Sequence, residues 1–422
     1  MSLSPVDVHA PTGPSKRSLD ELAVFGGAPT FAEPLHVGRP NIGDKDAVLA
    51  RISDLLDRRW LTNDGPFVQE FEQRIAEHLG VRNVVAMCNG TVALEIAIRA
   101  LGLSGEVIVP SFTFVATAHA LQWQEITPVF CDVDPESHTI DPARVEELIT
   151  PRTTGILGVH LWGRVCDVAA LQEIAQRRGL QLLFDAAHAF GNGMDGTMVG
   201  RFGRAEVFSF HATKFLNSFE GGAVATDDDD LAQRMRLMRN FGFEGLDTVT
   251  YVGTNGKMTE VAAAMGLTSL ESIDHFVAVN RRNHASYRAG LEDIAGLRLL
   301  EHTAEPANHQ YVVLEVTPAA GGLTRDHLLT VLRAENVLAR RYFYPGVHRM
   351  EPYRSFFPHA GLLLPRTEEL SRTVLTLPTG TAVDAGTVDA ICNVIRVAME
   401  HGPEVEGRLG GTAPPDLASA LR

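Results

Sequence analysis

Short apolar runs alternate with longer amphipathic runs over the first half of the chain. The apolar runs cover residues 84–87, 107–109, 128–131, 156–159 and 180–185, and the helical runs between them cover 92–101, 115–123, 142–149 and 168–177. Strands that are apolar along their whole length are typical of sheets buried on both faces, and an intervening helix is typical of parallel crossovers. The pattern predicts an α/β fold with a mainly parallel sheet covered by helices.

The rest of the chain extends this sheet and adds a second domain. Further strands are expected at 205–210 and 222–226, and a long helical stretch at 259–288 leads to a strand at 310–316 and helices at 325–333 and 385–400. Segments rich in Pro, Ser and Gly lie at both ends. We expect a flexible leader (1–20), a large domain (21–275), a smaller C-terminal α/β domain (276–402) and a flexible tail (403–422).

Composition narrows the class of protein. The chain has 422 residues with 45% hydrophobic and 21% charged residues, which is typical of a soluble enzyme. Its net charge of −15 argues against nucleic-acid binding, which needs a basic surface. The four cysteines show no CxxC spacing, so neither a zinc site nor a disulfide framework is expected. No apolar run approaches membrane-spanning length and no signal peptide is recognisable, so we expect a cytoplasmic protein that binds no membrane.

Lysine is rare in this chain, which limits the candidates for covalent chemistry. The four lysines are Lys16, Lys45, Lys214 and Lys257. Lys16 lies in the leader and Lys45 among charged residues, so both are expected to be solvated. Lys214 directly follows a strand and has aromatic neighbours, where the charged form of an amine is disfavoured and the free amine can form a Schiff base. A lysine that only extends from the edge of the core is the alternative.

Asp185 gives Lys214 a partner. It ends the strand at 180–185, and ligands of open α/β sheets bind beyond the carboxyl ends of the strands, so Asp185 and Lys214 can face one pocket. A carboxylate that holds a pyridine proton and a lysine that forms an imine are the two groups that a pyridoxal phosphate (PLP) enzyme needs. The alternative is that Asp185 only caps a helix.

Two further segments are candidates for ligand binding, and two other motifs are rejected. Gly90 and Thr91 follow a strand and open a helix, where backbone amides can hold a phosphate, although a plain helix cap is equally consistent. Residues 339–348 combine arginines with tyrosines, which suits a phosphate and a sugar or base, with a solvated loop as the alternative. Residues 191–196 satisfy GxGxxG but do not directly follow a strand, so we reject a nicotinamide fingerprint. The acidic residues 132–136 indicate a turn, and no metal site is expected.

The sequences of three segments resemble those of a known family. Residues 185–191 (DAAHAFG), 207–214 (VFSFHATK) and 220–224 (EGGAV) resemble the DegT/StrS-type sugar aminotransferases, which are PLP-dependent enzymes. The resemblance runs from about residue 60 to about residue 380 and is strongest to the dTDP-4-keto-6-deoxyglucose 4-aminotransferases of antibiotic-sugar pathways. It implies fold type I, the aspartate aminotransferase-like fold, with a large domain and a smaller C-terminal α/β domain.

The resemblance also implies roles for individual residues. Lys214 would form the imine and move the proton, Asp185 would hold the pyridinium proton, and an asparagine of a neighbouring subunit would reach the phosphate site, which implies a homodimer with shared active sites. The residues implied to bind the cofactor are Gly90, Thr91, Phe114, Asp185, His188, Ser209, Lys214 and, from the neighbouring chain, Asn255. Those expected to contact the nucleotide sugar are Arg341, Tyr342, Tyr344 and His348.

The implied reaction moves an amino group from an amino acid, L-glutamate by resemblance, to C4 of a nucleotide-linked keto-sugar. The alternatives are amination at C3 of a sugar or of a cyclitol, a dehydratase, and a PLP-fold protein that binds without catalysis. The dehydratase branch has histidine in place of the lysine, so Lys214 argues against it. Many relatives have asparagine directly after that lysine, whereas this chain has Phe215 and Leu216 before Asn217.

Overall fold

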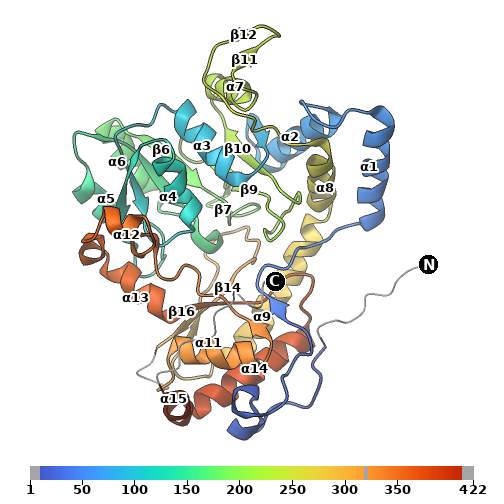
Figure 1. Ribbon diagram of the computed structural model, residues 1–422, viewed down its shortest axis with the longest axis vertical. Coiled ribbons are helices and arrows are strands. Elements are labelled where there is room, and N and C mark those ends of the chain that lie inside the picture. Colours follow the sequence, from blue (N-terminus) through green and yellow to red (C-terminus); the bar gives the residue numbers. More distant parts are fainter. Residues whose placement is uncertain (1–9, 318–321, 411–422) are drawn as a thin grey trace.

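A seven-stranded sheet forms the centre of the larger part of the molecule (Figure 1). The structure is a computed structural model that describes residues 10–317 and 322–410. The strand order is β2-β10-β9-β6-β5-β3-β4, and β10 runs antiparallel to both of its neighbours while the strands from β9 to β4 pair in parallel. The strands are β2 (Asn83–Met87), β3 (Glu106–Pro110), β4 (Thr127–Cys131), β5 (Thr153–Val159), β6 (Gln181–Asp185), β9 (Ala205–Ser209) and β10 (Gly222–Thr226). The mainly parallel α/β sheet expected from the sequence is confirmed.

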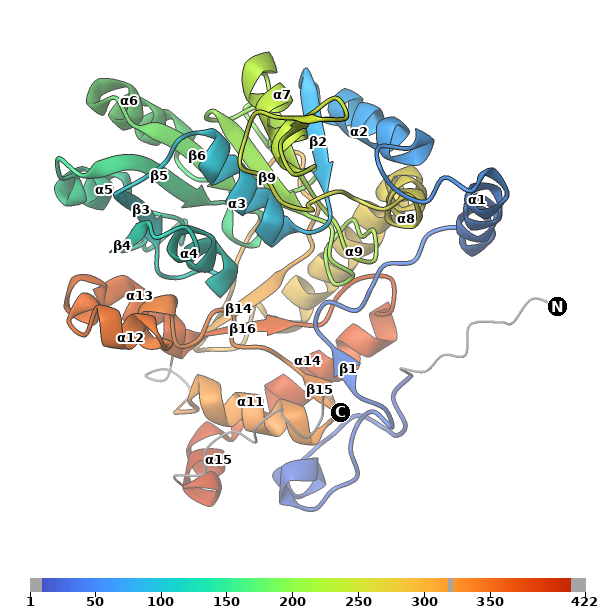
Figure 2. The same ribbon diagram turned by 45° about the horizontal axis from the view of Figure 1, so that its top comes forward.

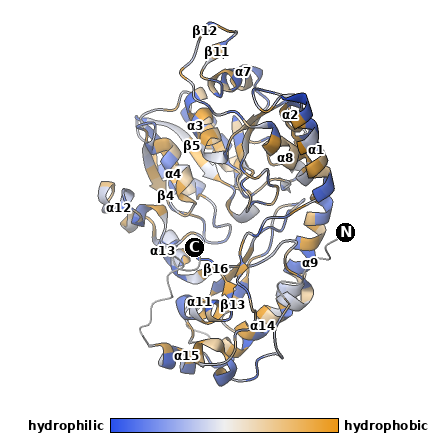
Figure 3. Ribbon diagram, turned by 45° about the vertical axis from the view of Figure 1, so that its right-hand side comes forward, coloured by the Kyte–Doolittle hydropathy of each residue, from blue (hydrophilic) through white to orange (hydrophobic). Residues whose placement is uncertain are grey.

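Helices cover both faces of this sheet. Those of the larger part are α1 (Lys45–Arg58), α2 (Pro66–Leu79), α3 (Gly90–Ala100), α4 (Val115–Gln122), α5 (Pro142–Leu148), α6 (Val168–Arg178), α7 (Asp229–Met238) and α8 (Glu260–Glu271). Helix α2 shows why they form: Pro66 starts it, Phe71 and Ile75 lie on its buried face, and Gly80 ends it with φ 69°. Most helices in Figure 3 carry both colours, as expected for helices with one buried face.

Several short elements punctuate the chain. They are the 3₁₀ turns η1 (Leu19–Glu21), η2 (Ala23–Phe25), η3 (Leu161–Gly163), η4 (Val347–Arg349) and η5 (Ala360–Leu363), and the hairpins β7 (Gly193–Met194) with β8 (Thr197–Met198) and β11 (Phe243–Glu244) with β12 (Thr248–Val249). The glycine-rich residues 191–196 therefore lead into the β7–β8 hairpin and open no helix. The β11–β12 hairpin projects from the body of the molecule (Figure 1).

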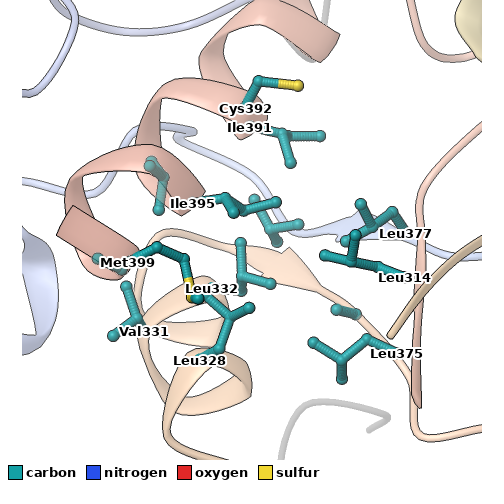
Figure 4. Close-up of a cluster of buried hydrophobic side chains, with 14 of the residues drawn as sticks. Leu314, Leu328, Val331, Leu332, Leu375, Leu377, Ile391, Cys392, Ile395 and Met399 are labelled. Atoms are coloured by element: carbon teal, nitrogen blue, oxygen red, sulfur yellow. The ribbon is translucent and has the colours of Figure 1, made fainter. Parts of the chain in front are cut away.

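The smaller part is built on an antiparallel sheet in the order β13-β14-β16. Its elements are α9 (Ile273–Leu291), β13 (Leu297–Leu299), β14 (Val312–Val316), α11 (Arg325–Ala334), β15 (Val337–Leu338), α12 (Tyr353–Phe356), α13 (Pro365–Thr373), β16 (Val374–Leu377), α14 (Ala385–Glu400) and α15 (Gly402–Leu409). Figure 4 shows its core, where Leu314 and Leu377 of the sheet meet Leu332 of α11 and Ile395 of α14.

The N-terminal segment packs on this smaller part. The sequence analysis instead expected a flexible leader up to residue 20 and assigned the residues from 21 onward to the large domain. Leu19, Leu22 and Phe31 are buried in the same cluster as the C-terminal helices, and β1 (Leu35–His36) pairs in parallel with β15. Figure 2 shows β1 beside β15, far from the large sheet. Hydrophobic contact with residues some 300 positions away determines where this segment packs, and no local sequence pattern predicts that contact.

Two further expectations about the chain ends differ from the structure. The Lys16 side chain is only 10% exposed and its ammonium lies 3.4 Å from the carboxylate of Glu335, so Lys16 is not freely solvated. Residues 402–409 form helix α15, so the expected tail does not begin at residue 403. Residues 1–9 and 411–422 lie outside the described residues. Within the described part of the chain, no helix is both long and apolar enough to cross a membrane.

Candidate active site

A cavity of about 640 Å³ lies at the carboxyl ends of the central strands and is closed on one side by the smaller part. Most of the residues expected to bind cofactor or substrate line it. These are Gly90, Thr91, Phe114, Asp185, His188, Ser209, Lys214 and Tyr342. The spatial convergence of residues spread over some 250 positions of sequence makes this cavity the candidate active site.

Lys214 projects into the cavity from a loop that the core holds in place. Its amide N–H donates to the carbonyl of His211 at 2.8 Å, and the next two residues, Phe215 and Leu216, are buried in the core. The Asn217 side chain donates to the Asn41 carbonyl at 2.7 Å and so ties the loop to the N-terminal segment. Burial lowers the pKa of Lys214 to about 8, against the opposing effect of the Asp185 carboxylate.

Asp185 ends β6 with its carboxylate inside the same cavity. One oxygen accepts from the Thr117 hydroxyl at 2.9 Å and the other from the Ala187 amide at 3.1 Å. Burial raises the pKa of Asp185, while these two donors and the charge of Lys214 oppose the rise. Burial removes water from this carboxylate. A cation placed beside it would therefore be stabilised by the negative charge, and the carboxylate by the cation.

The N-terminus of α3 forms a cradle for an anion. The Asn89 side chain caps the helix by accepting from the Val92 amide at 2.8 Å, which leaves the amides of Gly90 and Thr91 directed at the cavity without an intrahelical acceptor. A Cβ at residue 90 would approach the Cβ of Ser209 to 2.9 Å, so glycine allows the helix to begin this close to β9. These amides and the Ser209 hydroxyl match the needs of a phosphate.

Aromatic rings line the cavity next to these polar groups. The ring of His188 stacks on Phe343 with centroids 5.8 Å apart and planes at 9°, and it lies 4.5 Å from the ring of Tyr311. Burial, reinforced by the Lys214 charge, lowers the pKa of His188 well below its ordinary value. Its Nδ1 accepts from the Trp162 amide at 3.2 Å, so the neutral ring carries its proton on Nε2. Phe114 is 55% exposed and its ring is free to cover a planar ligand.

The remaining expected substrate residues lie outside the cavity lining. Arg341 forms an ion pair with Asp326 at 3.1 Å and its guanidinium packs over the ring of Tyr344 at 4.1 Å. His348 is buried, where its Nε2 donates to Glu368 at 2.8 Å. Both side chains therefore have partners outside the cavity.

Asn255 is also outside the cavity of its own chain. It is exposed, and its side-chain oxygen accepts from the Lys257 ammonium at 2.8 Å. Lys257 is further engaged by Asn240 at 3.0 Å and by the ring of Phe241 at 4.8 Å. Lys257 therefore has fixed partners, and Lys214 is the lysine that faces the cavity.

Sequence reasoning missed several residues of the cavity. Tyr311, Arg340 and Phe343 line it from the smaller part, and Thr117 of α4, which is outside the lining, donates to Asp185. Arg340 lies within the segment 339–348 that the sequence analysis singled out, but the sequence does not distinguish it from Arg341. No sequence signal marks Tyr311, whose position depends on how the two parts pack.

The acidic residues 132–136 have structural partners. Asp132 accepts from the amides of Arg366 and Thr367 at 2.9 and 2.8 Å, and Asp134 accepts from the amides of Glu136 and Ser137 at 3.0 and 2.7 Å. Over residues 10–317 and 322–410, no three His, Cys, Asp or Glu side chains converge as metal ligands.

The mainly parallel sheet, with a buried carboxylate and a lysine of lowered pKa on one cavity beside a helix N-terminus, matches the aspartate aminotransferase-like class. A model of the DegT/DnrJ/EryC1/StrS aminotransferase family matches residues 43–396. A dTDP-4-amino-4,6-dideoxy-D-glucose transaminase of Shigella dysenteriae is 37% identical over 86% of this chain and 99% of its own length. A GDP-perosamine synthase of Caulobacter vibrioides is 37% identical over 74% of this chain and 84% of its own.

Solved structures are also similar to this chain. DesI, crystallised in the presence of its TDP-sugar product, superposes with a TM-score of 0.89 at 49% identity over 93% of this chain and 99% of its own. DesV of S. venezuelae, in complex with a ketimine intermediate, superposes with a TM-score of 0.79 at 32% identity over 84% of this chain and 95% of its own. The chain belongs to the DegT/DnrJ/EryC1/StrS aminotransferase family, and the resemblance stated from the sequence is confirmed.

Proposed function

We propose that this enzyme uses pyridoxal phosphate to move an amino group from an amino acid, L-glutamate, to C4 of a nucleotide-linked keto-sugar of the dTDP-4-keto-6-deoxyglucose type. The observation that carries the proposal is that Lys214 and Asp185 open onto one cavity beside the α3 N-terminus. The Shigella transaminase and DesI, whose descriptions name a dTDP-amino sugar and a TDP-sugar product, support the substrate class. The resemblance to antibiotic-sugar enzymes supports a place in antibiotic deoxysugar biosynthesis in the cytoplasm.

The residues present fit the cofactor. The amides of Gly90 and Thr91 with the Ser209 hydroxyl would hold the phosphate, and a Cβ at residue 222 would approach the Gly90 amide nitrogen to 2.7 Å and disturb this cradle. Asp185 would accept a hydrogen bond from the protonated pyridine nitrogen, and Phe114 would cover the ring. When bound, pyridoxal phosphate supplies an aldehyde that links to an amine and an electron-withdrawing ring that makes the neighbouring carbon acidic.

The protein's own groups then move the protons. With the cofactor bound, the Lys214 amine, with its pKa of about 8, would act as the base that takes a proton from the donor carbon and as the acid that gives it back. Asp185, fixed by the Thr117 hydroxyl, would place its carboxylate against the ring nitrogen. His188, neutral with its proton on Nε2, would offer a hydrogen-bond donor that does not compete with Lys214 for protons.

We further propose that a second copy of this chain completes each site with Asn255. Asn255 faces solvent here, and the neighbouring β11–β12 hairpin and the segment that follows it expose apolar side chains, with Leu246 92% and Val252 73% exposed. Exposed apolar groups on a projecting hairpin favour burial against a partner. Of the expected sugar contacts we retain Tyr342, which lines the cavity, whereas Arg341, Tyr344 and His348 stay sequence predictions.

The decisive experiment is a pair of single-turnover reactions. Purified enzyme with pyridoxal phosphate is mixed with L-glutamate, and the loss of cofactor absorbance in the visible range is followed. The aminated enzyme is then mixed with 4-keto and 3-keto nucleotide sugars and with a keto-cyclitol, and the products are identified by NMR. Amination at C4 supports the proposal; amination at C3 or of the cyclitol, or binding of the cofactor with no transfer, contradicts it.

A further inference from the structure

One charged side chain of the cavity forms no ion pair among the described residues. The charged residues of the lining are Asp185, Lys214, Glu220 and Arg340. Asp185 and Lys214 serve the cofactor under the proposed function, and Glu220 lies 3.6 Å from the ring of His211. No carboxylate within residues 10–317 and 322–410 forms an ion pair with Arg340, whose guanidinium lies 5.0 Å from the centre of the Tyr342 ring. With cofactor bound, Arg340 would be the remaining unpaired charge of the lining.

The backbone fixes Arg340 in this position. Its amide N–H donates to the Thr376 carbonyl at 3.1 Å, and its own carbonyl accepts from the Thr376 amide at 2.8 Å. This bridge to β16 leaves the side chain to project into the cavity, where Tyr342 lies against it. The neighbouring Arg341 projects away and is paired with Asp326. The two adjacent arginines therefore differ in partner and in access to ligand.

We propose that Arg340 binds an anionic oxygen group of a substrate, either the carboxylate of the amino donor or the diphosphate of the nucleotide. A guanidinium offers parallel N–H donors that match both groups, and its contact with a tyrosine ring orients the fork. In a protein with a net charge of −15, an unpaired guanidinium on a cavity wall is a local exception that attracts anions. The inference rests on the proposed function, in which both substrates carry such a group.

The test separates the two half-reactions in Arg340→Gln and Arg340→Lys holoenzymes. The concentration of L-glutamate at half-maximal rate is measured in the first half-reaction, and that of dTDP-4-keto-6-deoxyglucose in the second. We expect Arg340→Gln to raise one of them about 10- to 100-fold, the loss that follows from removing a charge-assisted hydrogen bond. Arg340→Lys, which keeps the charge but not the fork, should lie between. Arg354→Gln, an exposed arginine of α12, is the matched control.

Direct binding gives a second readout. Glutarate and dTDP do not react, so their binding can be measured by calorimetry. Whichever of the two resembles the substrate affected in the kinetic test should bind Arg340→Gln more weakly than it binds the wild type. A loss for glutamate and glutarate assigns the carboxylate, and a loss for the sugar and dTDP assigns the diphosphate.

Unchanged constants for both substrates in a variant that retains its cofactor spectrum would overturn the inference. So would a loss that appears in Arg341→Gln instead. If the wild-type enzyme performs neither half-reaction, the proposed function fails, and the calorimetry still decides whether Arg340 binds an anion.

Discussion

Lys214 and Asp185 acquire their chemistry from shared burial. Burial lowers the pKa of the lysine to about 8 and raises that of the aspartate, and the attraction between their charges limits both shifts. An exposed lysine keeps its proton to about pH 10.4, so at neutral pH Lys214 presents far more free amine than an exposed lysine would. The sequence indicated this site because a lysine among aromatics and an aspartate at a strand end are local signals. Thr117, which fixes Asp185 from another helix, has no such signal.

The rate of cofactor capture should follow the free amine of Lys214. Because only the unprotonated amine attacks an aldehyde, capture of pyridoxal phosphate by cofactor-free enzyme should accelerate about tenfold per pH unit below pH 8 and level off above it. Rapid-mixing absorbance between about pH 6 and pH 10 measures this. Lys214→Ala should show no covalent capture and no turnover, while Lys45→Ala, changed at the exposed start of α1, should match the wild type. A rate still rising well above pH 9 would contradict the lowered pKa.

Thr117→Val should weaken cofactor binding without unfolding the enzyme. The change keeps the shape of the side chain but removes the hydroxyl that donates to Asp185 at 2.9 Å, so a buried carboxylate oxygen loses its partner and the pKa of Asp185 rises further. The cost of such a loss is about 1–3 kcal/mol, or roughly a 10- to 100-fold rise in the Kd for pyridoxal phosphate. A fluorescence titration measures it, and Thr117→Ser should restore most of the affinity. Equal Kd values for valine and wild type would show that Asp185 does not need this donor.

At the scale of elements, the sequence predicts what depends on local pattern. The fully apolar runs predicted the buried strands, and Gly90 and Thr91 were expected to open a helix, as they do in α3. The orientation of loop side chains was less accessible: Arg341 was expected at the substrate, yet Arg340 lines the cavity, because the bridge to Thr376 sets which side each residue faces. Pairings between distant segments such as β1 and β15 have no local signature.

Gly266→Ala should destabilise the contact between α2 and α8. A Cβ at residue 266 would meet the ring of Phe71 at 2.6 Å, and Phe71 is fully buried and cannot move aside. Replacing a helical glycine by alanine gains about 1 kcal/mol of helix propensity, but overpacking costs about 1–3 kcal/mol, so the net effect should be a lower Tm. Thermal unfolding followed by circular dichroism measures this. Gly407→Ala in α15, where a Cβ meets open space, is the control and should not lower Tm; a Tm for Gly266→Ala at or above wild type would refute the clash.

At the scale of the molecule, the cavity exists only because the two parts pack together. The Asn308 side chain donates to the carbonyls of His188 and Phe190 at 3.1 and 3.0 Å, which anchors the strand that presents Tyr311 to the cavity. The sequence predicted both parts, but it could not say which residues of the smaller one would meet the sheet, because that depends on tertiary packing. It also assigned the N-terminal segment to the wrong part for the same reason.

A hybrid of two inactive variants tests whether the sites are shared between chains. Asn255→Ala should lose most of its cofactor affinity if Asn255 serves the site of a second copy, and Lys214→Ala should be inactive. When the two variants are unfolded together and refolded, a mixed dimer would hold one site with both native residues and one with neither, so roughly a quarter of wild-type activity should return. Refolding each variant alone is the control. If both residues belonged to one chain's site, every site in the hybrid would carry one defect, and no activity would return.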